Sequence, residues 1–274
     1  MPSFAIAFPQ IDPVALSFGP IAIRWYALGY LGGIFGGWWL MNRLVTANRL
    51  WPQGSTITRE HVGDLVIWVT IGIVVGGRLG YVLFYNPAYF ADNPGEIFAV
   101  WSGGMAFHGG FLGVVIALIM FARKYNIPML SLGDAVACVV PIGLLLVRGA
   151  NFINGELWGR PTDVPWGMVF PGAGHEPRHP SQLYEAGLEG LALFALLLLL
   201  AFAFKAFARP GLLIGVFFVF YGASRIFVEN FREPDAHLGF IAGPLTMGMI
   251  LSLPMIIAGM GFLIYAMRQP KQAA

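Results

Sequence analysis

Long apolar runs separated by short polar connections follow one another from residue 21 to residue 267. Each run has about the 20 residues that an α-helix needs to cross the hydrocarbon core of a bilayer. We therefore expect an all-α, polytopic membrane protein with about seven transmembrane helices, in which residues 1–274 form a single integral membrane domain. The expected spans are residues 21–41, 62–85, 106–122, 132–150, 183–204, 211–229 and 243–267.

Two of these segments have features beyond their hydrophobicity. The first span carries closely spaced glycines, which predict close helix packing; they are Gly29, Gly32, Gly33, Gly36 and Gly37. Residues 95–106, just before the short third span, are a candidate for a re-entrant segment. We see no internal repeat of the kind that builds inverted-repeat transporters.

The composition excludes an ordinary soluble domain. Hydrophobic residues make up 57% of the chain and charged residues only 11%, with a mean hydropathy of +0.71. A soluble protein needs more charge on its surface. The net charge of +2 is too small to indicate a nucleic-acid partner. The single cysteine, Cys138, lies in an apolar run and is expected to be a small packed hydrophobe.

Basic residues fall mainly in alternate loops, which predicts the orientation by the positive-inside rule. Loops 42–61, 123–131 and 205–210 and the C-terminal tail would face the cytoplasm. The N-terminus and loops 86–105, 151–182 and 230–242 would face outward and form the rim of a site near the outer leaflet. The first set carries Arg43, Arg49, Arg59, Arg123, Lys124, Lys205, Arg209, Arg268 and Lys271, and the second carries Arg160, Arg178 and Arg232.

Polar residues gather where the fourth span ends. Arg148 closes the apolar run, and Asn151, Asn154 and Glu156 follow it within a glycine-punctuated stretch, residues 148–160. Such groups are costly in a bilayer unless they pair, face water or bind a ligand. The stretch is therefore our first functional-site hypothesis.

Three more arginines, Arg24, Arg78 and Arg225, lie in or at the ends of spans. Arg24 is expected to snorkel to lipid headgroups. Arg225 precedes Glu229 by four residues, so a structural ion pair on one helix face is the alternative to a functional role. Several arginines near one face would suit a phosphate, which the planar guanidinium can hold with two hydrogen bonds. In a membrane the most abundant phosphate is that of phospholipid headgroups.

Histidine, serine and tyrosine supply further candidates. His108, between Phe107 and two glycines, is a candidate general base, with a structural histidine as an equal alternative. Ser181 is expected to cap the fifth span, with Glu185 in its first turns. Tyr26 and Tyr221 suit interface anchoring. No metal-ligand motif is present, so no metal or cofactor is expected.

The stretch from Arg148 to Gly159, Arg-Gly-Ala-Asn-Phe-Ile-Asn-Gly-Glu-Leu-Trp-Gly, closely resembles the signature of the bacterial prolipoprotein diacylglyceryl transferases. One departure is Val147, where the family usually has glycine before the signature arginine. Further blocks that resemble the family, in the family's order, are residues 23–26, 76–86, 103–110, 178–185 and 221–232.

This resemblance implies a definite reaction in the bacterial cytoplasmic (inner) membrane. The diacylglyceryl group of phosphatidylglycerol would be transferred to the lipobox cysteine thiol of a preprolipoprotein signal peptide. The products would be a thioether-linked prolipoprotein and glycerol-1-phosphate, in the first step of lipoprotein maturation. The partners would be these two substrates and the surrounding membrane lipids.

The resemblance also implies roles for single residues. Arg148 would bind the phosphate, Arg225 would stabilise the departing glycerol phosphate, and His108 would be the base. The signature's polar residues would hydrogen-bond glycerol hydroxyls or brace the arginines, and Gly159 would be needed for the turn. These polar residues are Asn151, Asn154 and Glu156. Tyr26 and Glu229 would shape the pocket, and Tyr221 and Arg78 are further substrate-binding candidates.

Two other function classes fit the residues without the resemblance. A phospholipid- or anion-translocating protein would also need buried arginines and broken helices, but it predicts access from both faces of the membrane. A membrane phosphatase or headgroup-exchange enzyme would act on phospholipid without requiring a peptide thiol.

Overall fold

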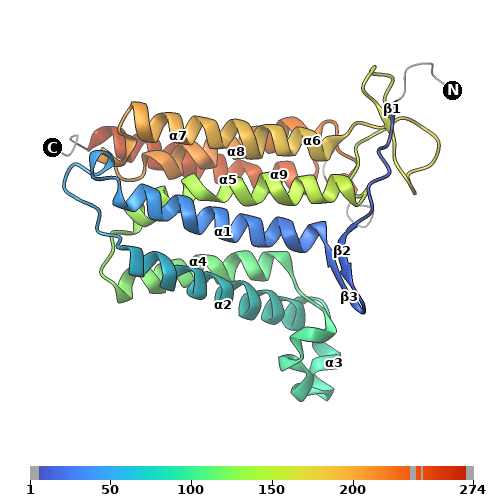
Figure 1. Cartoon of the computed structure of the whole chain (residues 1–274), viewed down its shortest axis with the longest axis horizontal. Coiled ribbons are helices and arrows are strands. Elements are labelled where there is room, and N and C mark those ends of the chain that lie inside the picture. Colours follow the sequence, from blue (N-terminus) through green and yellow to red (C-terminus); the bar gives the residue numbers. More distant parts are fainter. Residues whose placement is uncertain (1–5, 235–238, 242, 270–274) are drawn as a thin grey trace. The chain divides into compact units, whose positions relative to one another are not determined.

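The computed structural model of the chain describes residues 6–234, 239–241 and 243–269. Long helices make up most of it (Figure 1). They are α1 (Trp25–Thr46), α2 (Arg59–Phe84), α4 (Phe107–Lys124), α5 (Met129–Ile153), α7 (Leu193–Ala203), α8 (Leu212–Glu229) and α9 (Met247–Arg268). The shorter helices are α3 (Pro87–Asp92), α6 (Ser181–Glu185), the 3-10 turns η1 (Asn48–Leu50), η2 (Pro94–Phe98), η3 (Val100–Ser102) and η5 (Ala206–Ala208), and the π-helix η4 (Ala186–Ala192).

The helix lengths and compositions confirm an all-α, polytopic membrane protein. Six helices of the described chain are long and apolar enough to span a membrane, and one of them, Ser181–Ala203, joins α6, η4 and α7. The first expected span is also helical, as α1, but its many glycines and tryptophans contribute little hydropathy. The orientation of these spans stays a prediction.

The chain divides into two compact units. The first comprises Met1–Met41, Arg49–Gln53 and Gly133–Ala274, and therefore holds most of α1, most of α5 and all of α6 to α9. The second comprises Asn42–Asn48 and Gly54–Leu132 and holds α2, α3 and α4. The single integral domain expected from the sequence stays a prediction.

Glycines let helices approach closely within each unit. A Cβ added to Gly33 of α1 would lie 2.9 Å from the Cα of Gly143 in α5. In the second unit a Cβ on Gly80 of α2 would lie 2.8 Å from the Cα of Gly109 in α4. Small residues permit such backbone contact between membrane helices, where lipid supplies no hydrophobic drive for association. The packing role expected for glycines of the first span is confirmed at Gly33.

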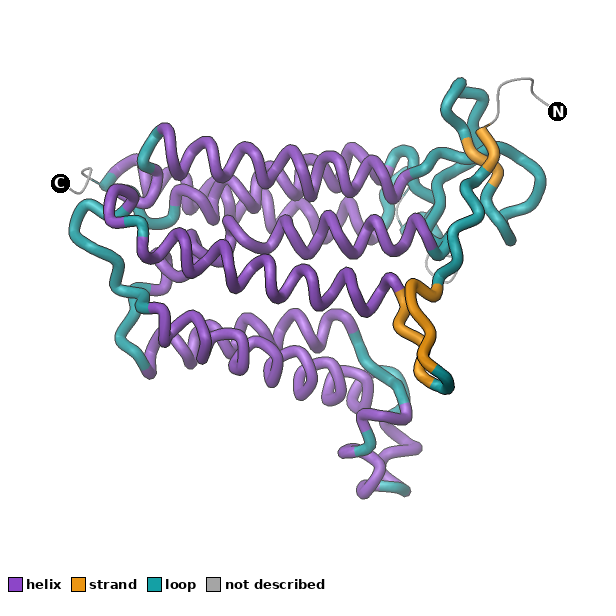
Figure 2. The backbone as a smooth tube through the Cα atoms, viewed as in Figure 1, coloured by secondary structure: helices purple, strands orange, loops and turns teal. Residues whose placement is uncertain are grey.

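Short strands lie outside the helices of the first unit, and the sequence analysis did not predict them (Figure 2). β2 (Val14–Phe18) pairs antiparallel with β3 (Ile21–Arg24), which leads directly into α1. β1 (Ile6–Ala7) pairs in parallel with β4 (Met168–Val169). This second pairing ties the N-terminal segment to the loop between α5 and α6.

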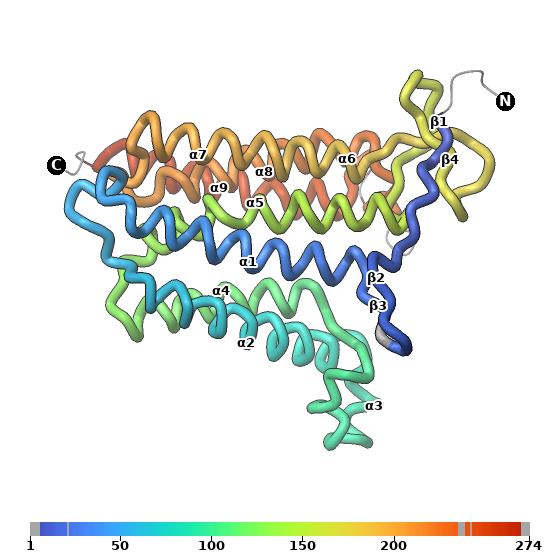
Figure 3. The backbone as a smooth tube through the Cα atoms, in the orientation of Figure 1, coloured from blue at the N-terminus to red at the C-terminus, as the bar shows by residue number. Residues whose placement is uncertain are grey.

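A buried carboxylate fixes α8 against α5. Asp134, fully buried in α5, accepts hydrogen bonds from the backbone N–H groups of Gly211 and Ile214, each 2.8 Å long. The first N–H groups of a helix lack partners within that helix, so an acceptor from a neighbouring helix can cap it. Figure 3 follows the chain from α5 through the loop and α6–α7 to α8. Asp134 therefore sets the register in which the far ends of α5 and α8 meet.

The glycine contacts predict opposite effects of one substitution at two positions of α2. Gly80→Ala places a methyl group against Gly109 and should destabilise the protein by about 1–3 kcal/mol through overpacking. Gly63→Ala, with nothing within 4 Å of the added methyl, should stabilise it by about 0.5–1 kcal/mol through helix propensity. Thermal unfolding in detergent measures both. Equal shifts at the two positions would contradict the packing argument.

Candidate active site

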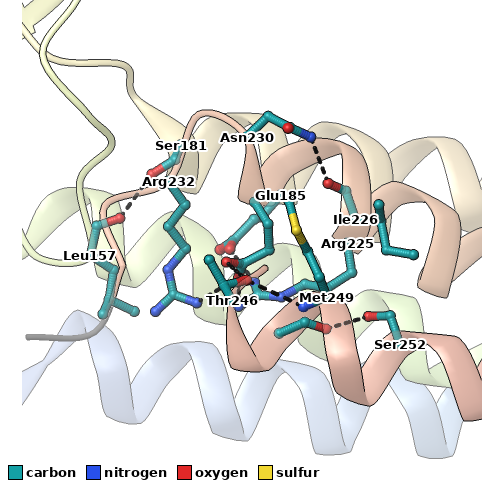
Figure 4. Close-up of polar contacts among 12 residues, drawn as sticks. Leu157, Ser181, Glu185, Arg225, Ile226, Asn230, Arg232, Thr246, Met249 and Ser252 are labelled. Atoms are coloured by element: carbon teal, nitrogen blue, oxygen red, sulfur yellow. Dashed lines mark hydrogen bonds and ion pairs between the residues drawn. The ribbon is translucent and has the colours of Figure 1, made fainter. Parts of the chain in front are cut away.

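Five charged side chains of the first unit form a continuous network, which we call the arginine–glutamate cluster. Its members come from the end of α5, from α6, from the last turns of α8 and from the residues just after α8. They are Arg148, Glu185, Arg225, Glu229 and Arg232. Figure 4 shows Glu185, Arg225 and Arg232 pointing toward one another beside Thr246 of the α9 N-terminus.

Glu185 lies at the centre of the cluster and joins two helices. Its Oε2 is 2.7 Å from Nε of Arg148, and its Oε1 pairs with Nη1 of Arg225. The Glu185 side chain is only 1% exposed. One buried carboxylate thus holds the guanidinium groups of α5 and α8 side by side, overcoming their mutual repulsion.

The capping roles expected for Ser181 and Glu185 are wrong. Ser181 makes no cap; its hydroxyl donates to the carbonyl of Leu157, 3.0 Å away. Glu185 turns toward the arginines instead of its own helix terminus. The charged partners come from helices that are distant in sequence, so local spacing favoured capping.

Glu229 neutralises the other side of Arg225. Its Oε1 lies 2.5 Å from Nη2 of Arg225, the i, i+4 ion pair that the spacing predicted, and 3.5 Å from Nη1 of Arg232. Its Oε2 accepts a 2.7 Å hydrogen bond from the hydroxyl of Thr246. Gly248 gives this carboxylate room, because a Cβ there would lie 2.5 Å from Oε1.

The polar residues of the signature stretch support Arg148. Asn151 accepts a 3.3 Å hydrogen bond from Nη1 of Arg148 and donates one of 2.8 Å to Glu156. Asn154 donates to the same Glu156 oxygen over 3.3 Å. Asn151 therefore connects Glu156 to Arg148 through two hydrogen bonds and orients the Arg148 guanidinium.

Gly159 is required for space rather than for the turn. Its N–H donates to the carbonyl of His179 at 2.8 Å, and an added Cβ would lie 2.6 Å from the Cβ of His179. Its own φ is not positive; the positive φ values of this stretch belong to Gly155 (65°) and Leu157 (58°). The expectation that Gly159 makes the turn is therefore corrected, and its lack of a side chain lets the loop close on α6.

Tyrosines from two helices border the cluster. The ring of Tyr26 lies 5.2 Å from that of Tyr30, and Tyr30 interacts electrostatically with Arg148 and Glu156. Tyr221, one turn before Arg225 on α8, interacts with both Arg225 and Arg148. Tyr26 and Tyr221 are therefore near the cluster in addition to any role at the membrane interface.

Several residues of this region are absent from the site predicted from the sequence, in which Glu185 has only a capping role. Glu185 and Glu189 are both fully or almost fully buried, and Tyr30 stands one turn after Tyr26. Two acids four residues apart inside the apolar run 183–204 were the available signal, because the bilayer penalises unpaired charge. Thr246 carried no signal, since only the fold brings the start of α9 to Glu229.

Two of the predicted site residues belong to the second unit. Arg78 is buried, and its guanidinium donates to the backbone carbonyls of Glu96, Ile97, Gly103 and Gly104. It therefore organises the segment that follows α3. His108 lies exposed in the first turn of α4, with its ring edge-on to that of Phe107.

A small pocket opens beside the cluster, between the end of α8 and the start of α9. Its lining combines two arginines with two glutamates and the first residues of α9. The lining residues are Arg225, Glu229, Arg232, Glu233, Gly239, Thr246, Met247 and Gly248. The pocket therefore presents guanidinium groups beside the N-terminus of α9, an arrangement suited to an anion.

The charge of the region is positive when its paired groups are counted. Arg160 joins the arginines of the cluster because it donates to the carbonyls of Arg232 and Glu229. Glu156 joins the two glutamates through Asn151. Four guanidinium groups thus meet three hydrogen-bonded carboxylates, and Glu233 is balanced by Arg178. The region therefore carries one positive charge when the buried Glu189 is neutral. In the described part of the chain no group of three or more histidine, cysteine or acidic side chains is placed to hold a metal ion.

The central position of Glu185 predicts a large loss of stability when it is removed. Glu185→Ala leaves two arginines, 17% and 12% exposed, without the buried carboxylate between them, and breaking a buried pair in this way costs about 3–5 kcal/mol. Glu233→Ala is the matched control, because Glu233 pairs with Arg178 while 46% exposed and its loss should cost about 0–1 kcal/mol. Unfolding in denaturant compares the two, and equal losses would argue against the bridge.

Comparison with known proteins identifies the family. The family described as prolipoprotein diacylglyceryl transferase matches residues 13–265 of the chain. A phosphatidylglycerol–prolipoprotein diacylglyceryl transferase of Rhodopseudomonas palustris is 58% identical over 100% of this chain and 96% of its own length. Proteins of the same name are 57% identical in Nitrobacter hamburgensis, over 95% and 90% of the two chains, and 54% identical in Agrobacterium fabrum, over 97% and 96%. This chain therefore belongs to the prolipoprotein diacylglyceryl transferase family.

Proposed function

We propose that this chain is a phosphatidylglycerol–prolipoprotein diacylglyceryl transferase. The names of full-length relatives at 54–58% identity support this activity. The structural observation that carries it is the pair of arginines, Arg148 and Arg225, held on the single buried carboxylate of Glu185. Two adjacent guanidinium groups, in a region with one net positive charge, suit a phosphodiester monoanion.

Arg148 binds the phosphate of phosphatidylglycerol in this proposal. Glu185 and Asn151 engage its Nε and Nη1, and no described residue bonds its Nη2. A guanidinium offers five N–H donors, so donors remain for phosphate oxygens. Because its partners hold it in place, little reorganisation is needed when the lipid binds.

Arg225 stabilises the group that leaves. The cysteine thiol attacks the glycerol carbon that bears the phosphate, so a sulfur–carbon bond forms and the carbon–oxygen bond to the phosphate breaks. Negative charge grows on the departing glycerol phosphate. A preorganised arginine in a water-poor site lowers the energy of that developing charge. Glu229 and Glu185 fix the position of Arg225 for this role.

The thiol must lose its proton before it attacks, because the thiolate is the nucleophile. His108 is the proposed base, supported by its exposed position at the start of α4 among glycines. Arg78, Tyr26 and Tyr221 remain proposed substrate-binding residues. Of these, Tyr221 is supported by its electrostatic interaction with both arginines of the site.

We place this reaction at the outer leaflet of the bacterial inner membrane, on the lipobox cysteine of the prolipoprotein signal peptide. The support is the distribution of basic loops, which assigns the end of α5 and the following loop to the outward side. Both substrates lie in the membrane, so lateral access between helices is expected.

The test of the activity is release of glycerol phosphate by the purified protein in detergent. Phosphatidylglycerol is supplied with a lipobox peptide, or with the same peptide carrying serine in place of cysteine. Release that requires the cysteine supports the transferase. Release with either peptide would indicate a phospholipase-like enzyme, and no release from folded protein would favour lipid or anion translocation.

Removing the phosphate-binding arginine should abolish transfer without unfolding the protein. We expect Arg148→Ala to lower the turnover at least about 100-fold, the effect of losing one preorganised donor to a developing anion. Arg148→Lys should recover little, because an ammonium cannot reproduce the planar fork. Arg123→Ala, at an exposed position near the end of α4, is the control and should keep full activity. Near-normal turnover of Arg148→Ala would refute the phosphate site.

A further inference from the structure

Among the described residues near the cluster, Glu189 is an acidic residue whose role the proposed reaction leaves unexplained. Its exposed fraction is 0%, and neither of its carboxylate oxygens has a hydrogen-bond partner among the described residues. Buried polar groups in proteins are almost always hydrogen-bonded, and exceptions occur at catalytic positions. An unpartnered carboxyl group next to an arginine cluster therefore calls for a functional account.

The backbone around Glu189 is unusual as well. It lies within η4, a π-helical stretch that interrupts the span Ser181–Ala203. Such insertions are rare and occur frequently at functional sites. The neighbouring Gly190 brings this stretch against α5, since a Cβ there would lie 2.8 Å from the Cα of Leu145. The helix is thus pressed against the element that carries Arg148 at the level of Glu189.

Charged groups from the neighbouring helices interact electrostatically with Glu189. Glu185 lies one turn earlier on its own helix, Arg148 acts from α5, and Arg225 and Arg232 act from α8 and from the residues after α8. Tyr221 of α8 also interacts with it. Glu189 is therefore electrostatically connected to both arginines of the proposed phosphate site.

The surroundings favour a neutral Glu189 in the resting site. An ionised carboxylate that is buried and receives no hydrogen bond is strongly disfavoured. Arg148 and Arg225 are already engaged by Glu185 and Glu229, and the charge of Glu185 further opposes ionisation. With Glu189 protonated, the region keeps its single positive charge, which a phosphodiester monoanion neutralises. Glu189 thus brings a proton, but no charge, to the site.

We propose that Glu189 is the proton donor to the phosphate that leaves during diacylglyceryl transfer. This inference rests on the proposed function. As the carbon–oxygen bond breaks, its electron pair stays on the phosphate oxygen, and the Glu189 carboxyl group transfers its proton to the departing phosphate. The glycerol phosphate then leaves as a monoanion. The carboxylate that remains is transiently stabilised by Arg225 and Arg148.

The proton balance of the cycle closes without any other reactant. The base takes the thiol proton when the thiolate forms, and Glu189 gives its own proton to the phosphate. Transfer of the first proton from the base to Glu189 restores the resting site. The net change is one sulfur–carbon bond formed, one carbon–oxygen bond broken, and one proton moved from sulfur to phosphate.

Glu189→Gln tests the donor role directly, because glutamine is neutral and similar in shape but has no acidic proton. We expect its KM for phosphatidylglycerol to stay within about twofold and its turnover to fall about 100-fold to 10,000-fold, the usual contribution of general acid catalysis. Glu60→Gln, at an exposed position in the first turn of α2, is the control and should leave both constants unchanged.

A modified lipid separates a donor from a packing residue. In a phosphatidylglycerol analogue with sulfur as the bridging atom between the diacylglyceryl carbon and phosphorus, the thiophosphate leaves without needing a proton. Glu189→Gln should therefore use this analogue within about tenfold of the unmodified protein, since general acid catalysis is no longer required. Equal losses with both lipids, or no loss with the natural lipid, would overturn the donor role.

The unmodified protein provides a further measurement that does not depend on folding of the variant. Its turnover of the natural lipid should fall at alkaline pH as the donor loses its proton, and this fall should be absent with the sulfur analogue. The same alkaline profile for both lipids would overturn the proposal. If the unmodified protein shows no thiol-dependent release at any pH, the transferase function itself fails, whatever the role of Glu189.

Discussion

The ion pairs of Glu185 are the interaction on which the rest of the site depends. Two guanidinium groups from different helices would repel each other in a medium of low dielectric constant, and one buried carboxylate between them turns that repulsion into a link. Glu229 and Asn151 then fix the outer side of each arginine. The arginines are therefore held in place before any lipid arrives, which is the condition for electrostatic catalysis.

The two helices that carry Arg148 and Arg225 are also joined at their other ends. Asp134 caps α8 from α5, so the two helices that carry Arg148 and Arg225 are fixed in register about four turns away from the site. The loop between α5 and α6 closes at Gly159, where the absence of a side chain lets its backbone pair with that of His179. Polar groups thus lie at helix ends, while the apolar middle of each span faces other helices or lipid.

A buried acid without a partner is the feature that connects this scaffold to proton movement. Such a group is costly in a membrane protein, so its presence beside the proposed phosphate site favours a chemical role over a packing one. Glu189 also lies in a π-helical stretch, and such departures from regular α-helical geometry are frequent at functional sites. Charge stabilisation by the arginines and proton donation by Glu189 would act on the same departing phosphate.

The sequence by itself determined the membrane class, the helical spans and the signature stretch, because hydrophobic length and the high cost of charge in lipid are local properties. It also predicted the Arg225–Glu229 pair, whose partners are one helical turn apart. Only the tertiary structure decided that Glu185 bridges Arg148 and Arg225. Those contacts join residues 37 and 40 positions apart, and no local periodicity encodes which buried acid meets which arginine once the helices pack.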